Sequence, residues 1–217
     1  MKKVLVLCEG QTEETFVNRI LSPHLVARQV CLIPTLLKTK RVKSGTTFKG
    51  GVTSYEKLRQ DVRRLLRDSS AVLVTTLLDY YGLPPDFPGK STLRGGTPHR
   101  RVEHLERAFA QDIGDARFLP YLMLHEFEAL LFVRPREIFE TLNQPVSSAL
   151  LEVASSHNSP EEINEGQTTH PAARIQQYAR VYRKALHGPL IVERIGLPSL
   201  RSKCPHFDQW LIRLEAL

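Results

Sequence analysis

Five carboxylates follow apolar runs of the sequence, and their type and placement suit metal-dependent chemistry. They are Glu9, Glu13, Asp79, Glu126 and Glu128. Carboxylates that face one shared space repel one another unless a cation lies between them, and oxygen ligands suit Mg²⁺ or Mn²⁺. A bound cation would activate a water molecule and offset charge that develops on a phosphodiester, while a carboxylate free of metal would move a proton. The sequence therefore predicts a divalent-cation site, with Mg²⁺ or Mn²⁺ as the cofactor.

Each acid also has an ordinary structural interpretation. Asp79 stands before Tyr80-Tyr81-Gly82, a sequence typical of a turn, and the helix dipole favours acids at a helix start. The two tyrosines could stack on bases or pack within the protein, and His125 could be a ligand, a base or a structural residue. The shared placement of the acids, rather than any one of them, favours the site.

Strands and helices that alternate along the first half of the chain would bring these acids together. Apolar runs predict strands over residues 4–8, 31–37, 71–78 and 118–124, and periodic apolar positions predict helices over 12–21, 55–66 and 101–110, the first capped by Thr12. This alternation is typical of a parallel sheet, whose strands end at one shared edge. Glu9, Asp79 and the acids after His125 would all lie at that edge.

The second half of the chain lacks a run that resembles a core strand. Six prolines divide it into short helices: Pro145, Pro160, Pro171, Pro189, Pro198 and Pro205. We therefore expect an α/β protein with a core over residues 1–124 and a helical extension over 125–217 that packs on the core and completes the acidic site.

Composition and charge narrow the choice of partner. The 217 residues carry a formal net charge of +7, which makes a polyanion such as DNA or RNA a plausible partner. A basic segment, whose Lys38, Lys40, Arg41 and Lys43 would contact phosphates, is equally well explained as a solvated connector. Three cysteines without paired spacing predict buried free thiols. The absence of an apolar segment long enough for a signal peptide or a membrane span predicts a cytoplasmic protein.

Several motifs resemble a known superfamily. The opening Glu9-Gly10-Gln11-Thr12-Glu13 resembles the first signature of the Toprim domain, which topoisomerases, primases and the overcoming-lysogenization-defect nucleases share. Four later motifs are similar to a bacterial and archaeal family of Toprim-like proteins: Asp79-Tyr80-Tyr81-Gly82-Leu83-Pro84, His125-Glu126-Phe127-Glu128-Ala129-Leu130-Leu131-Phe132, Pro160-Glu161-Glu162-Ile163-Asn164 and Cys204-Pro205-His206-Phe207. The resemblance implies a Toprim-like, mostly parallel sheet flanked by helices, with a metal-binding acidic edge.

The same resemblance assigns roles to the acids. It implies that Glu9 and Glu13 bind metal together with Asp79, and that either Glu126 or Glu128 supplies a further carboxylate. The superfamily's usual Asp-x-Asp is Asp79-Tyr80-Tyr81 here, which leaves open whether one or two metals bind. A Ser-Lys pair of the family is replaced by Ala172-Ala173 before Arg174, so that Arg174 and Lys184 become the candidates for contacting phosphate.

Two functions from different classes follow from these observations. The first is a Mg²⁺-dependent nuclease for DNA or RNA, with Glu9, Asp79 and Glu126 as catalytic residues and Glu9, Glu13, Asp79 and Glu128 on the metal. By resemblance it would be the effector of an ATPase partner in antiviral defence, and a homo-oligomer is compatible with it. The second is a binding subunit that has lost turnover and recruits nucleic acid or an ATPase. Nucleotidyl transfer is weaker, because the sequence has no Gly-Lys-Ser phosphate loop.

Overall fold

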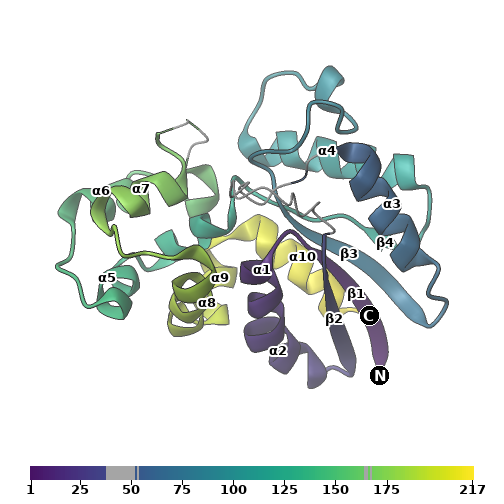
Figure 1. The fold of residues 1–217 in the computed structure, drawn as a ribbon, viewed down its shortest axis with the longest axis horizontal. Coiled ribbons are helices and arrows are strands. Elements are labelled where there is room, and N and C mark those ends of the chain that lie inside the picture. Colours follow the sequence, from purple (N-terminus) through teal and green to yellow (C-terminus); the bar gives the residue numbers. More distant parts are fainter. Residues whose placement is uncertain (38–51, 53, 164–165, 167) are drawn as a thin grey trace, which may run out of the picture.

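The fold comes from a computed structural model that describes residues 1–37, 52, 54–163, 166 and 168–217 (Figure 1). The basic segment with Lys38, Lys40, Arg41 and Lys43 lies outside the described residues. The interpretation of these four residues as phosphate contacts therefore stays a prediction.

The centre of the molecule is a parallel sheet. Its strands are β1 (Lys2–Cys8), β2 (Val30–Leu36), β3 (Ala71–Asp79), β4 (Phe118–Leu119) and β5 (Leu122–Met123). The order is β2-β1-β3-β4, β5 also pairs with β3, and each of these pairs is parallel. The predicted α/β class with a mostly parallel sheet flanked by helices is confirmed. Because β1 and β3 are neighbours, their carboxyl ends lie side by side.

The last predicted strand, over residues 118–124, is interrupted between β4 and β5. Pro120 stands at the interruption, where it has no N–H to donate to a neighbouring strand. The Thr76 hydroxyl replaces the missing ladder, because it donates to the carbonyl of Tyr121 and accepts from the N–H of Tyr121, each at 2.9 Å. A side chain of β3 thus holds the segment that leads to Glu126 and Glu128.

Replacing Thr76 with valine should leave both buried backbone groups of Tyr121 without their partner. We expect the free energy of unfolding to fall by about 1–3 kcal/mol, the cost of unsatisfied buried polar groups. Urea denaturation followed by the fluorescence of Trp210, the only tryptophan, measures this. Thr35→Val on β2 is the control and should change the free energy by less than about 0.5 kcal/mol. Equal values for the two variants would contradict the role of the Thr76 hydroxyl.

Helices cover both faces of the sheet because alternate strand residues point to opposite sides. Val4, Val6 and Cys8 of β1 belong to one core, whereas Leu5 and Leu7 belong to the other. The first core packs against α1 (Gln11–Phe16), the π-helical turn η1 (Val17–Leu21) and α2 (Ser22–Val26). Residues of α8 (Lys184–Ile195) and α10 (Pro205–Glu215) also belong to this core. The second packs under α3 (Tyr55–Leu66) and α4 (Pro98–Ile113), which lie together on the other side of the sheet (Figure 1).

The described residues after 125 form short helices, as predicted. Besides α8 and α10 they are η3 (Phe127–Val133) and η4 (Pro160–Glu162), both 3₁₀, together with α5 (Arg136–Leu142), α6 (Ser148–Ser155), α7 (Pro171–Tyr178) and α9 (Leu197–Lys203). One prediction is wrong, because Pro189 lies inside α8 instead of ending a helix. Buried Ile191, Val192 and Ile195 anchor α8 in the first core and offset the hydrogen bond that the proline removes.

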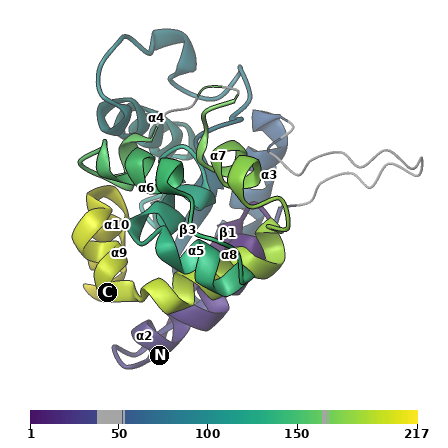
Figure 2. The same cartoon turned by 90° about the vertical axis from the view of Figure 1, so that its left-hand side faces the viewer.

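This helical part shares a core with the sheet. Phe16 and Leu77 from the first half and Phe127 and Trp210 from the second all belong to one buried cluster. Figure 2 looks onto the helical part, with α5 to α8 in front of β1 and β3. The division at residue 125 stays a prediction. In the part of the chain that the structure describes, no helix has the length and apolar character needed to cross a membrane.

Candidate active site

The acids that follow β1 and end β3 are in direct contact. Cys8 pairs with Leu77 across the two strands, which places Glu9 beside Asp79. The backbone N–H of Asp79 donates to Glu9 Oε2 at 3.0 Å. Two acids separated by 70 positions of sequence therefore meet at the carboxyl edge of the sheet, where the sequence predicted them.

Glu13 reaches the same place from the first turn of α1. The helix is capped at Gly10 and begins at Gln11, so the predicted cap at Thr12 is wrong. The N–H of Gly10 donates to Glu13 Oε2 at 2.9 Å, which ties the carboxylate to the turn after β1. Only 2% of Glu13 is exposed, and its Oε1 lies 3.8 Å from Lys184 Nζ.

Glu126 and Glu128 follow β5 but face different neighbours. The backbone of His125 has a φ of 65°, and this turn leads the chain into η3. Glu126 Oε1 accepts from the N–H of Ala172 at 2.6 Å, and His170 Nδ1 lies 2.8 Å away. Glu128 is fully buried and accepts from the Tyr182 hydroxyl at 3.1 Å. Glu128 therefore belongs to the centre of the cluster, while Glu126 lies at its margin against the start of α7.

Lys184 occupies the centre of the acidic cluster. Its Nζ lies 3.1 Å from Asp79 Oδ2, 3.2 Å from Glu128 Oε2 and 3.8 Å from Glu13 Oε1. Lys184 is the first residue of α8, where the helix dipole disfavours a positive charge, so the carboxylates rather than the helix hold it there. One ammonium thus stands where a cation is needed to offset three carboxylates.

Burial and mutual repulsion raise the pKa values of these acids. Burial, followed by the charge of Asp79, raises the pKa of Glu13 to about 7. Burial raises the pKa of Glu128 to about 7 against the opposing effect of Lys184. The pKa values of Glu9 and Asp79 are also raised, mainly by burial, and that of Lys184 is raised by the carboxylates against the effect of its burial. When all four of these carboxylates are ionised, their negative charge exceeds the positive charge of the one ammonium of Lys184.

The raised pKa values predict that stability depends on pH. An acid whose pKa is higher in the folded state favours folding while it is protonated, so its contribution is lost as pH rises from about 4.5 to about 7. We expect the metal-free protein to lose on the order of 2 kcal/mol of unfolding free energy between pH 5 and pH 8. Urea denaturation at several pH values should show a smaller loss for Glu128→Gln, which cannot titrate. An unchanged slope in this variant would contradict the assignment.

The donor set of the cluster fits a divalent cation. Glu13 Oε1 and Glu128 Oε2 are buried oxygens that face the ammonium of Lys184, and Asp79 Oδ2 faces the same ammonium. Hard oxygens of this kind are the ligands of Mg²⁺ and Mn²⁺. No three His, Cys, Asp or Glu residues of the described chain are arranged to hold a metal as they stand. The ammonium of Lys184 separates the carboxylates, so metal binding would require it to leave.

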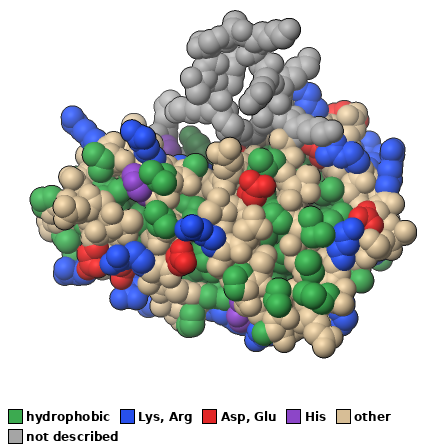
Figure 3. Space-filling view, turned by 60° about the horizontal axis from the view of Figure 1, so that its bottom comes forward, with side chains coloured by type: hydrophobic (Ala, Val, Ile, Leu, Met, Phe, Trp, Pro, Cys, Tyr) green, Lys and Arg blue, Asp and Glu red, His purple; other side chains and the backbone are tan. Residues whose placement is uncertain are grey.

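The structure places other sequence candidates at the edge of the cluster or away from it. Arg174 on α7 donates through Nε to the carbonyl of Thr169, which ties it to the turn before that helix. His125 is buried, and its ring lies edge-on to Tyr80. Among the described residues that Figure 3 colours, Lys and Arg are interspersed with acids rather than gathered in one patch.

Sequence reasoning missed three participants. No pattern in the sequence marks His170 or Tyr182, and the sequence predicts Lys184 as a contact for phosphate rather than for the carboxylates. Lys184 lies at the start of α8, an unfavourable place for a positive charge that points to a local acidic partner, but the sequence does not predict a helix start there. The three cysteines are free thiols, as predicted, but only Cys8 and Cys204 are buried, whereas Cys31 is half-buried.

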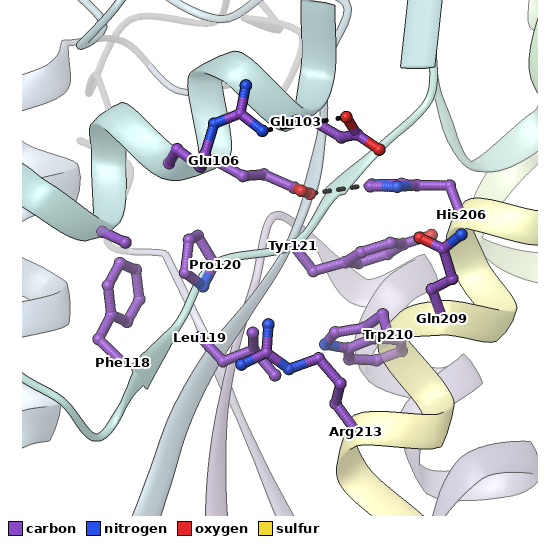
Figure 4. A pocket seen from close by; sticks show the side chains of 12 residues that line it. Glu103, Glu106, Phe118, Leu119, Pro120, Tyr121, His206, Gln209, Trp210 and Arg213 are labelled. Atoms are coloured by element: carbon purple, nitrogen blue, oxygen red, sulfur yellow. Dashed lines mark hydrogen bonds and ion pairs between the residues drawn. The ribbon is translucent and has the colours of Figure 1, made fainter. Parts of the chain in front are cut away.

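A separate cavity of about 310 Å³ lies between α4, β4 and α10 (Figure 4). At its inner wall Glu106 Oε1 lies 2.9 Å from His206 Nε2, and Tyr121 is stacked between His206 and Trp210. The indole N–H of Trp210 donates to Thr75 of β3. These rings are engaged with one another in packing, and the five acids do not line this cavity.

The fold and the site define an α/β protein with an acidic cluster at the carboxyl edge of a parallel sheet. The chain belongs to the family of a domain of unknown function (DUF4276), whose model matches residues 8–215. No curated protein and no solved structure matches the chain. The matched range contains Lys184 and all five acids of the cluster.

Proposed function

We propose that this protein hydrolyses phosphodiesters in nucleic acid with the help of Mg²⁺ or Mn²⁺. The observation that supports this most is the convergence of acids from three separate segments around one cationic group. Asp79, Glu13 and Glu128 would hold the ion, which supplies Lewis-acid chemistry when bound. Because structural ion pairs seldom need several carboxylates with raised pKa values around one lysine, a functional site is the better explanation.

The remaining groups have roles that their positions suggest. The pKa of Glu9 is raised, and its carboxylate accepts a hydrogen bond from the backbone N–H of Asp79. Glu9 is therefore suited to accept a proton from an attacking water. Lys184, once displaced from the carboxylates, would remain close enough to contact a phosphate oxygen. Glu126 is held by Ala172 and His170 and would orient the substrate side of the site.

The biological setting follows from resemblance alone. The likeness of the opening motif to Toprim proteins supports an activity on DNA or RNA. We propose, on the same ground, a cytoplasmic effector that works with an ATPase partner in antiviral defence. A neighbouring ATPase gene would support this partnership.

A binding subunit without turnover is the second candidate, and Lys184 is the observation that favours it. An ammonium within 3.2 Å of Asp79 and Glu128 offsets part of their charge without any metal. A protein of this kind would keep the fold and bind nucleic acid while ignoring Mg²⁺. Calorimetric titration with Mg²⁺ and Mn²⁺ separates the two candidates.

Cleavage assays test the proposed hydrolysis directly. Plasmid, single-stranded DNA and tRNA are incubated with the protein in Mg²⁺, in Mn²⁺ and in EDTA. We expect cleavage that needs metal and falls at least about 100-fold in Glu128→Gln, because a buried ligand is lost. Glu14→Gln is the matched control, since Glu14 lies next to Glu13 on α1 but is not among the acids that pair with Lys184 in the described part of the chain. Metal-independent cleavage, or equal activity of both variants, would reject the proposal.

A further inference from the structure

An exposed aromatic pair lies beside the acidic cluster. Tyr81 follows β3 and stacks on His170 with ring centroids 5.1 Å apart and planes 19° from parallel. Its neighbour Tyr80 is buried, whereas 39% of Tyr81 is exposed. With the phenol ring stacked on the imidazole and the residue 39% exposed, part of the Tyr81 side chain stays accessible to a ligand.

The pair is joined to the acids through its own residues. Tyr81 is two positions from Asp79, and its N–H donates to the carbonyl of His125 at 2.7 Å. His170 Nδ1 lies 2.8 Å from Glu126 Oε1. A single side chain, that of His170, therefore separates the exposed ring from Glu126 at the margin of the acidic cluster.

Local structure fixes the pair before any ligand arrives. His170 is the N-cap of α7, and its own N–H donates to the carbonyl of Gly166 at 2.9 Å. Gly82 turns the chain directly after Tyr81 with a φ of 91°, a conformation that glycine adopts without strain. A rigid ring costs little entropy when it binds, which suits a stacking surface.

We propose that the Tyr81–His170 pair binds an unpaired nucleobase next to the phosphodiester that the acidic cluster holds, so that the substrate is single-stranded nucleic acid. This inference rests on the proposed function and adds its substrate class. Stacking on an aromatic ring accepts every base, because each base has a flat face. A base within a duplex has both faces covered by its neighbours and cannot stack on Tyr81.

Fluorescence anisotropy with labelled oligonucleotides tests the inference without cleavage, in Ca²⁺ in place of Mg²⁺. Matched single-stranded and duplex probes are used, each as DNA and as RNA. We expect Tyr81→Ala to weaken single-strand binding about 5- to 150-fold, the range of one lost base stack, and to change duplex binding by less than about 2-fold. Tyr81→Phe, which keeps the ring, should rescue most of the lost binding.

Tyr178→Ala is the control, because Tyr178 is also 39% exposed but lies at the far end of α7. It should bind all probes as the wild type does. An equal loss for single strands and duplexes, or no loss in Tyr81→Ala, overturns the inference. If the wild type cleaves with Mg²⁺ while Tyr81→Ala binds normally, the inference alone fails. If Tyr81 supports binding but no probe is ever cleaved, the hydrolysis fails and the stacking site stands, and a wild type that binds no probe rejects both.

Discussion

Replacing Lys184 with methionine is expected to destabilise the metal-free protein and to enlarge its stabilisation by Mg²⁺. Methionine keeps an unbranched side chain that is one atom shorter, but it leaves Asp79, Glu128 and Glu13 without their shared ammonium. Breaking a fully buried ion pair costs 3–5 kcal/mol, roughly, and the 38% exposure of Lys184 reduces this to about 2 kcal/mol. For a chain of this size the melting temperature should fall by about 5 °C.

The same substitution removes the competitor for the cation. In the wild type a divalent ion must displace the ammonium, whereas in the variant it meets carboxylates that repel one another. The melting temperature of the variant should therefore rise more steeply with Mg²⁺ concentration than that of the wild type. Differential scanning fluorimetry at pH 8 in EDTA and in a Mg²⁺ series measures both effects. Lys57→Met is the control, because Lys57 is exposed on α3, and it should show neither effect. If the melting temperature of Lys184→Met responds to Mg²⁺ as that of Lys57→Met does, Lys184 does not compete with metal.

Replacing Asp79 with asparagine should abolish cleavage while preserving the fold. Asp79 Oδ1 accepts from the N–H of Phe127 at 3.0 Å, and an asparagine oxygen can keep this bond. The lost charge is that of Oδ2, which faces Lys184 and would face the cation. We expect activity to fall at least about 100-fold, with the melting temperature within a few degrees of the wild-type value.

Single-turnover cleavage assays measure the activity of Asp79→Asn, and circular dichroism measures its melting temperature. Asp86→Asn is the matched control, because Asp86 is an exposed acid in the loop that follows β3. Its activity should equal that of the wild type. Residual cleavage by Asp79→Asn at the rate of this control would remove Asp79 from the site.

The sheet and the meeting of the acids were predictable because they depend on local pattern and on one general rule. Apolar runs of the length of β1 and β3 are typical of strands buried on both faces, and parallel strands expose their carboxyl ends together. The range predicted for α3 matches its observed bounds, since its apolar residues recur at helical spacing. The start of α1 was less accurate, because Gly10 and Thr12 are both acceptable caps.

The contacts that depend on tertiary structure were not predictable in the same way. Lys184 lies 105 positions from Asp79, and nothing in the spacing of the sequence indicates that they meet. The partnership of His170 with Glu126 depends on how α7 packs against the turn after β5. The split between β4 and β5 follows from Pro120, yet the hydroxyl of Thr76 that bridges the gap is visible only once the strands are paired.

The most direct measurement is diffraction from crystals soaked in Mn²⁺, with data collected to locate the anomalous signal of the metal. The account predicts a peak within about 2.5 Å of carboxylate oxygens of Asp79, Glu128 and Glu13, with the Lys184 ammonium moved away from them. Crystals that show no peak, with Lys184 still among these carboxylates at high Mn²⁺ concentration, would contradict it.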